Sequence, residues 1–330
     1  MRIEWFLPAF LILLLSSDLM AADFPQAEIS NGIIRANLYL PDPEHGYYRG
    51  TRFDWSGVIY SLKYKEHEYF GQWFEHYDPK IHDAIMGPVE EYRTNDAGLG
   101  YEEAKTGGTF IRIGVGIVRK PEEKSYQLFN TYDIVDPGKW SVRKGPTWIE
   151  FTHNLKDSSG YAYVYTKRIQ LLENKPELVL EHTLRNTGRL LIETTQYNHN
   201  FFVLDQQPTG PDFVVKFPFE VKAKRDLSGV AHINGAQLEY LRELEKGQSV
   251  FTEMEGFGAK VQDYDFRIEN RKVGAGVRIR GDRPITMLNF WCIRTTLCPE
   301  PFVQLKIPPG EASKWTIQYE FYTLPASSAR

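Results

Sequence analysis

The sequence predicts an all-β protein with large antiparallel sheets, and three observations support this prediction. Most segments of the 330-residue chain alternate apolar and polar residues with a period of two. Clusters of Gly, Pro, Asn and Asp separate these segments, as turns do between neighbouring strands. Aromatic residues make up 14% of the chain, and they favour strands and the packing between sheets.

The clearest strand patterns lie in the second half of the chain. Each is rich in β-branched or aromatic residues and has the alternation of a strand with one buried face. Short turns between such strands favour antiparallel pairing. The predicted strands are residues 161–169, 177–184, 191–197, 212–219, 275–281, 303–307 and 314–322.

Two connections between these strands have distinct patterns. The sequence Asn186-Thr187-Gly188 predicts the turn of a β-hairpin, in which Gly188 supplies a positive φ. Residues 236–246 (AQLEYLRELEK) are the clearest helical pattern. Since no repeat, low-complexity tract or flexible linker divides the chain, we expect residues 23–330 to form a single domain.

Residues 1–22 have the pattern of a cleaved signal peptide. Arg2 gives a basic start, residues 6–15 (FLPAFLILLL) are apolar, and Ala21 and Ala22 are small residues at the expected cleavage point. The apolar run is too short to span a bilayer comfortably, and no later segment comes close. We therefore expect a periplasmic or secreted protein without a membrane span.

Charge and cysteine content narrow the possible partners. A formal net charge of −4 gives no electrostatic basis for binding nucleic acid or an anionic membrane surface. In an extended chain Cys292 and Cys298 would lie roughly 20 Å apart, beyond the reach of a disulfide, although a turn between them would allow pairing. We expect two unpaired, buried thiols, and the histidines have no spacing typical of a metal site.

Three segments in the second half of the chain form an ordered set. Residues 183–205 end a strand with an Asn-His pair before an aromatic run (QYNHNFFVLD). Residues 263–291 contain a Tyr-Asp strand, a hairpin and a strand that follows Asp-x-Pro. Residues 298–321 contain a glutamate before a strand, a Pro-Gly-Glu turn and a strand of alternating aromatics. In this order the segments resemble those of aldose 1-epimerases, the galactose mutarotase-like family.

This resemblance implies a β-supersandwich with a cleft in which the ring of an aldose opens. Interconverting the anomers requires a base that removes the C1 hydroxyl proton and an acid that protonates the ring oxygen. The resemblance implies His199 as the acid and Glu300 as the base, so the predicted class is an isomerase. No metal or organic cofactor is expected, and the predicted partner is a sugar, either a free aldose or the end of a glycan.

The resemblance also implies residues that hold the sugar. Asn198 is expected to orient His199 or contact hydroxyl groups, and Asp265 matches the family's substrate-holding aspartate, with Asp263 as the alternative. Arg52 matches the arginine that grips the sugar, and its alternative is a surface salt bridge. Phe201 and Phe202 should point to opposite faces of their strand, so that one forms the pocket wall and the other packs in the core.

One segment departs from the family pattern. The usual Leu-His-Gly-Gly sequence is absent, and DPKIHDAIMGPVEEYRTND (residues 78–96) stands in its place. His82 is the predicted substitute for the missing histidine, and Trp73 is predicted either to stack on a sugar or to pack in the core. Glu90 and Glu91 either line a changed substrate site or lie in a solvated loop, and we favour the loop.

Two other functions remain open. One is a carbohydrate-binding protein that has lost turnover, and the other is a polysaccharide lyase or hydrolase of related architecture. His199 and Glu300 facing each other across a short pocket would favour the epimerase, whereas a long open groove lined with basic residues would favour the lyase. The sequence does not predict the oligomeric state.

Overall fold

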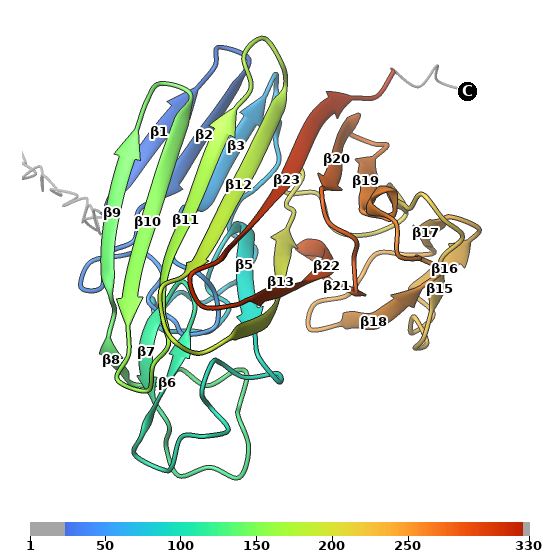
Figure 1. Ribbon diagram of the computed structural model, residues 1–330. Coiled ribbons are helices and arrows are strands. Elements are labelled where there is room, and N and C mark those ends of the chain that lie inside the picture. Colours follow the sequence, from blue (N-terminus) through green and yellow to red (C-terminus); the bar gives the residue numbers. More distant parts are fainter. Residues whose placement is uncertain (1–23, 326–330) are drawn as a thin grey trace, which may run out of the picture.

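The computed structural model describes residues 24–325, and almost all of the regular structure in this range is β-strand (Figure 1). Its single helical element is a 3-10 turn, η1 (Val261–Asp263), and no helix in this range is long and apolar enough to cross a membrane. Every strand pairing in the described range is antiparallel, which confirms the predicted fold class. The predicted signal peptide lies outside the described residues.

The largest sheet has ten strands and contains the long paired strands β11 (Ala162–Leu171) and β12 (Glu177–Asn186), next to the C-terminal strand. In spatial order its strands are β16 (Ala231–Asn234), β17 (Gln237–Tyr240), β14 (Phe213–Lys216), β19 (Asp265–Asn270), β20 (Ala275–Gly281), β23 (Ala312–Thr323), β12 (Glu177–Asn186), β11 (Ala162–Leu171), β10 (Trp148–Lys156) and β9 (Lys139–Lys144).

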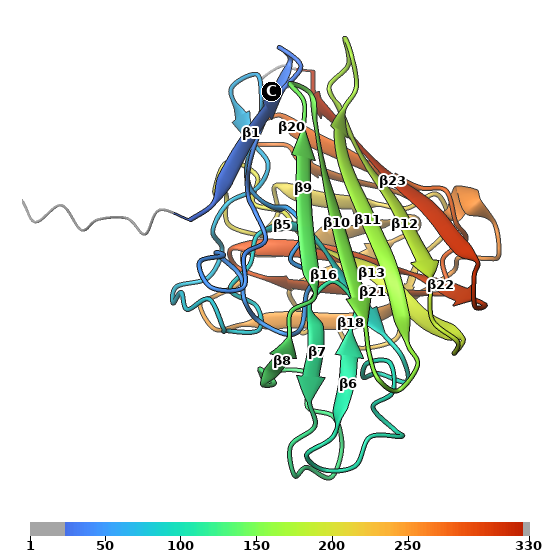
Figure 2. The ribbon, with the colours of Figure 1, turned by 60° about the vertical axis from the view of Figure 1, so that its left-hand side comes forward.

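A six-stranded sheet packs against the ten-stranded one, and Figure 2 shows its strands running across behind those of the larger sheet. In spatial order its strands are β15 (Lys222–Ala223), β18 (Ser249–Glu255), β21 (Met287–Ile293), β22 (Thr296–Ile307), β13 (Ile192–Phe201) and β5 (Gly87–Arg93).

Two smaller sheets come from the N-terminal half of the chain. One contains β1 (Gln26–Ser30), β2 (Ile34–Tyr39), β3 (Val58–Tyr64) and β4 (His67–Glu68), and the other contains β6 (Thr109–Arg112), β7 (Gly116–Arg119) and β8 (Ile134–Asp136).

The main core lies between the ten-stranded and six-stranded sheets. Leu180 and Tyr319 of the larger sheet and Leu305 of the smaller one belong to one buried cluster. Polar groups also connect the two layers, since the Tyr319 hydroxyl donates to Asn200 at 2.7 Å. One face of the six-stranded sheet is therefore core, and its other face is free to form a site.

The predicted strands in the second half of the chain are all present, but two connections differ from expectation. The predicted helix at residues 236–246 is wrong, because alternate burial of Leu238 and Tyr240 places β17 between β16 and β14. The predicted hairpin at Asn186–Gly188 is also wrong, because β12 and β13 belong to different sheets. Gly188 is not required for a positive φ there: a side chain at this position would meet the Gly160 carbonyl oxygen at 2.5 Å.

Cys292 and Cys298 are buried and unpaired. They lie on the β21–β22 hairpin, where Cys292 is opposite Leu297 and Cys298 is opposite Trp291. Because cross-strand partners share a face and successive residues alternate, the two thiols point to opposite sides of the sheet. The turn between them therefore does not bring them together.

Candidate functional site

A cavity of about 480 Å³ opens on the face of the six-stranded sheet that points away from the core. Strands of this sheet form one side of the cavity, and connections of the N-terminal half supply the other residues. The lining residues are Arg52, Trp73, His82, Asp83, Arg93, Leu128, Phe129, His199, Phe201, Phe251, Asn289, Trp291 and Glu300.

The register of three strands brings polar side chains into one row. Asn289 on β21 lies opposite Glu300 on β22. The β13–β22 register pairs Tyr197 with Phe302, and two residues further along β13 lies His199, next to Glu300. Because directly opposed residues of antiparallel strands share a face, Asn289, Glu300 and His199 all point to the cavity.

His199 and Glu300 are in direct contact. His199 Nε2 lies 3.1 Å from Glu300 Oε1, and each residue is 4% exposed. The imidazole stacks on Phe201 with ring centroids 3.9 Å apart, and Phe53 packs edge-on against it at 5.7 Å. Phe202 packs in the core instead. The prediction that one phenylalanine forms the pocket wall and the other packs in the core is therefore confirmed.

Burial determines where the pair holds its proton. It raises the pKa of Glu300 to about 7, although the positive charges of Arg52 and Arg93 oppose this shift. It also lowers the pKa of His199 well below the usual value, and the charge of Arg52 adds to the effect. Below about pH 7, Glu300 therefore holds the proton that can be donated, and the neutral imidazole can accept one. This resting state is the reverse of the roles that the resemblance implies.

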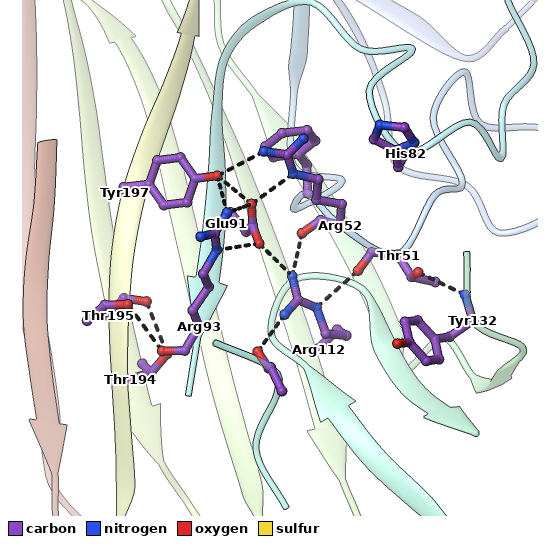
Figure 3. A network of polar contacts seen from close by, with 12 residues as sticks. Thr51, Arg52, His82, Glu91, Arg93, Arg112, Tyr132, Thr194, Thr195 and Tyr197 are labelled. Carbon is purple, nitrogen blue, oxygen red and sulfur yellow. Dashed lines mark hydrogen bonds and ion pairs between the residues drawn. The ribbon is translucent and has the colours of Figure 1, made fainter. Parts of the chain in front are cut away.

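A cluster of three arginines surrounds the carboxylate of Glu91 (Figure 3), together with Tyr197, whose ring centroid lies 6.2 Å from that of His199. Arg52 Nε donates to Oε2 at 3.0 Å, Arg93 Nε donates to Oε1 at 2.8 Å, and Arg112 Nη2 donates to Oε1 at 3.3 Å. The Tyr197 hydroxyl donates to Oε2 at 2.5 Å and accepts from Arg93 Nη2 at 2.9 Å. We call these five residues the Glu91 cluster.

The charges in the Glu91 cluster fix its protonation. Burial alone would raise the pKa of Glu91, but the guanidinium groups of Arg93 and Arg52 hold it well below the usual value. Burial raises the pKa of Tyr197 above its ordinary value, although Arg93 opposes the shift. The cluster therefore contains an ionised carboxylate and a neutral phenol.

Five of the seven predicted site residues line the cavity: His199, Glu300, Arg52, His82 and Trp73. Trp73 stacks on Phe201 at 4.8 Å, and its indole N–H donates to the Ile85 carbonyl at 2.9 Å. It is thus both a packed side chain and part of the cavity wall. Arg52 is 9% exposed and paired with Glu91, so the surface salt bridge considered for it is wrong.

Asn198 and Asp265 do not reach this cavity. Asn198 follows Tyr197 on β13 and points to the opposite face, where it donates to Glu90 Oε1 at 3.0 Å. Asp265 belongs to β19 of the other large sheet and accepts from Arg278 Nε at 2.7 Å. The alternative, Asp263, lies in η1 and also does not line the cavity.

The expectation that Glu90 and Glu91 lie in a solvated loop is wrong. Both belong to β5, and both have 0% exposure. Because successive strand residues point to opposite faces, Glu91 faces the arginines and Glu90 faces the ten-stranded sheet. Val89 and Tyr92 beside the two acids indicate a strand locally, but the partners that allow both acids to be buried lie far away in the sequence.

Several residues of the site were not predicted from the sequence. Arg93 lies two residues after Glu91 and therefore shares its face, which was a readable signal once residues 87–93 are recognised as a strand. Asn289 and Trp291 alternate in the same way on β21, but only their pairing with β22 shows that they accompany Glu300. Asp83 and Phe129 come from loops and give no sequence signal.

The described residues contain no group of three or more His, Cys, Asp or Glu side chains arranged to hold a metal ion. The polar groups of the cavity are instead two pairs of a histidine and an acid (His199–Glu300 and His82–Asp83), two guanidinium groups and an amide. Such a set can donate and accept protons and can bind hydroxyl groups or anions.

No family model and no curated protein matches this chain, but solved structures match nearly all of it. An aldose epimerase homologue from C. elegans is 14% identical and has a TM-score of 0.56, over 92% of this chain and 100% of the other. A galactose mutarotase-like protein from Clostridium acetobutylicum is 12% identical with a TM-score of 0.56, over 91% and 95% of the chains. A galactose mutarotase-like protein from Lactobacillus casei is 13% identical with a TM-score of 0.51, over 90% and 100%. The chain therefore has the galactose mutarotase-like fold.

Proposed function

We propose that this protein is an isomerase that interconverts the two anomers of an aldose by acid-base opening of the sugar ring. The observation that carries the proposal is the contact between His199 Nε2 and Glu300 Oε1, at 3.1 Å, on the wall of one cavity. The likeness in fold to aldose epimerase homologues supports the same reaction class.

The pair provides both proton transfers that the reaction needs. Protonated Glu300 donates to the ring oxygen while neutral His199 accepts the proton of the C1 hydroxyl group, and the bond between C1 and the ring oxygen breaks. The aldehyde rotates and closes on its other face as the protons return. Two groups within hydrogen-bond reach of the reacting oxygens can catalyse each step in both directions.

The size and surface of the cavity suit a single sugar better than a polymer chain. Its volume of about 480 Å³ is in the range of small-molecule pockets, and Trp73, Phe201 and Trp291 supply aromatic surface. Aromatic rings pack well against the apolar faces of sugars, and polar groups at the edge bind the hydroxyls. The arrangement expected for an epimerase had His199 and Glu300 facing each other across a short pocket. They lie instead in contact on one wall, so it is the small size of the cavity that favours an epimerase over a lyase.

The test is an NMR anomer-exchange assay over a panel of aldoses. The variants Glu300→Gln and His199→Asn each remove one proton-transfer group while keeping a polar side chain of similar size. Losing a positioned acid or base reduces rates by about 10²- to 10⁴-fold, so each variant should lose most of its kcat while folding normally.

Glu193→Gln is the matched control. Glu193 is on the same strand as Glu300's partner His199, but its side chain is 51% exposed and lies beside Lys306. This variant should exchange anomers at the wild-type rate. Full activity in the Glu300→Gln variant would exclude the proposed mechanism.

A carbohydrate-binding protein without turnover is the second candidate, and the same 3.1 Å contact is the observation in its favour. If His199 and Glu300 serve only as partners for each other, the sugar binds above them without reaction. Calorimetric binding of an aldose without enzymatic anomer exchange would support this candidate.

We also propose that the protein acts outside the cytoplasm, after removal of residues 1–22. The pattern of the N-terminal sequence motivates this proposal. N-terminal sequencing of the protein from the native host should begin near Asp23, and a cytoplasmic protein that retains Met1 would contradict it.

A further inference from the structure

Two arginines of the Glu91 cluster have nitrogens that face the cavity without a partner. Arg52 uses Nε and Nη2, and Arg93 uses Nε and Nη2, in contacts with Glu91 and Tyr197. Among the described residues, neither Nη1 atom has a hydrogen-bond partner. Neither atom is fully enclosed by the protein. Both arginines line the cavity, so these N–H groups are available to a ligand.

Arg112 differs from its two neighbours. Its Nε donates to the Thr51 carbonyl at 3.0 Å, its Nη1 to the Ala97 carbonyl at 2.6 Å, and its Nη2 to the Arg52 carbonyl at 2.8 Å. It is 1% exposed and does not line the cavity. The free nitrogens of the other two arginines are therefore a property of their place on the cavity wall.

The Glu91 cluster has more positive than negative charge. Three guanidinium groups surround one carboxylate, and Tyr197 remains neutral, so two positive charges are uncompensated. The other acids of the cavity are Asp83, which is paired with His82 Nε2 at 3.2 Å, and Glu300. Even with Asp83 counted in full, the site keeps a positive charge while Glu300 holds its proton.

Positive charge held in a largely buried site is unfavourable unless an anion compensates it. Arg52 is 9% exposed, so water compensates its charge only in part. Planar guanidinium groups match the oxygens of carboxylates, phosphates and sulfates, and they form the stronger, charge-assisted type of hydrogen bond. The free nitrogens and the surplus charge thus call for the same kind of ligand group.

We propose that the aldose bound in this cavity carries an anionic group, which pairs with the free Nη1 atoms of Arg52 and Arg93. This inference rests on the proposed function and names its substrate class. Arg93 on β5 lies opposite Thr195, four residues from His199 on β13, but its guanidinium reaches back along the strand to the Tyr197 hydroxyl, and Tyr197 shares a face with His199. An anion at one end of a sugar can therefore bind the arginines while C1 at the other end lies at His199 and Glu300.

The experiment compares sugars that differ only at C6, with the full chain and at a pH below 7, where Glu300 holds its proton. Glucose is the neutral member, and glucuronate, glucose 6-phosphate and glucose 6-sulfate carry the three anionic groups. Binding is measured by calorimetry and turnover by NMR anomer exchange. We expect at least one anionic sugar to bind roughly 10- to 100-fold more tightly than glucose.

The comparison of the four sugars identifies the anionic group. It also distinguishes a failure of this inference from a failure of the proposed function. Tighter binding of glucuronate alone would assign a sugar acid, and tighter binding of the phosphate or sulfate would assign that ester. Selective binding without anomer exchange would uphold the anion site and overturn the isomerase. Anomer exchange with glucose bound as tightly as every anionic sugar would overturn the anion site and leave the isomerase intact.

Variants test whether the two free nitrogens cause the preference. Arg52→Lys and Arg93→Lys keep the charge but lose the planar fork, so each should reduce the ratio of anionic to neutral sugar affinity by about tenfold. Arg143→Lys is the control, since the Arg143 side chain is 73% exposed on β9 and pairs with Glu150, and this variant should keep the wild-type ratio. An unchanged ratio in both cavity variants would overturn the assignment, and the wild-type comparison decides the matter if a variant fails to fold.

Discussion

Two adjacent glutamates on β5 collect two very different clusters of charge. Glu90 points between the sheets, where Lys167 Nζ donates to it at 2.5 Å, His182 Nε2 lies 2.9 Å away and Asn198 donates at 3.0 Å. Glu91 points the other way, to three arginines and a tyrosine at the cavity. Two consecutive residues thus belong to two different clusters, one closed off from the cavity and one open to it.

The Glu90 cluster is closed to solvent, since Glu90, Lys167 and His182 are at most 2% exposed, although His182 Nδ1 has no hydrogen-bond partner among the described residues. Its nearest second acid is Asp54, which accepts from Tyr165 at 2.9 Å, and Lys167 is the cation between the two carboxylates. Burial alone would raise the pKa of Glu90, but Lys167 lowers it to about 2. The acids and the lysine leave no surplus positive charge, and the cluster has no path to a ligand. Its role is to connect β5 to β11 and β12.

The Glu91 cluster has the same burial at its centre but surplus positive charge and free N–H groups at its rim. The difference teaches that buried charge alone does not mark a binding site in this fold. The marker is buried charge whose hydrogen-bonding capacity is not used up and which borders a cavity.

The largest stability effect is expected in the closed cluster. Lys167→Met removes the cation from Glu90 and Asp54 and leaves buried acids without their main partner. Breaking such a pair reduces the free energy of unfolding by about 3–5 kcal/mol. Urea unfolding followed by tryptophan fluorescence measures the loss. Lys63→Met is the control, since Lys63 is 62% exposed and should change stability by less than about 1 kcal/mol.

A smaller stability loss is expected in the open cluster. In Arg93→Met, Glu91 keeps Arg52, Arg112 and Tyr197 as partners, so we expect a loss of about 1–3 kcal/mol in the same unfolding experiment. The difference between the clusters would disappear if this variant were destabilised as much as Lys167→Met. In that case the open cluster would have to be regarded as structural too.

The smallest effect is expected for Asp265→Asn. Asp265 pairs with Arg278 on the ten-stranded sheet and does not line the cavity. Sugar affinity and turnover should match the wild type in the calorimetric and NMR assays. A rise in KM would return Asp265 to the binding role that its sequence position implies.

The strands could be predicted from the sequence because their signal is local. Residues 315–321 alternate strictly and residues 177–186 do so apart from Val179, and neither pattern needs knowledge of its partner strand. His199 and Glu300 were identified because three segments resemble a known family in order. The approach of Phe201 to the imidazole follows from strand alternation alone.

The charge clusters could not be predicted because their partners are distant in the sequence. Glu90 is 77 residues from Lys167 and 92 residues from His182. Without these partners an acidic pair is best interpreted as solvated, since unpaired charges are rarely buried. The same reason explains the missed role of Arg93, whose exposure to the cavity depends on where Arg52 and Tyr197 lie.

The pH dependence of anomer exchange tests the central claim most directly, because it needs no variant. The reaction requires one proton on the His199–Glu300 pair, and the pKa of Glu300 is raised to about 7. Above this pH the pair loses that proton, so kcat/KM, after subtraction of the spontaneous reaction, should fall about tenfold per pH unit. A kcat/KM that stays constant or increases as the pH rises through this value would contradict the account, because the deprotonated pair would then be sufficient for turnover.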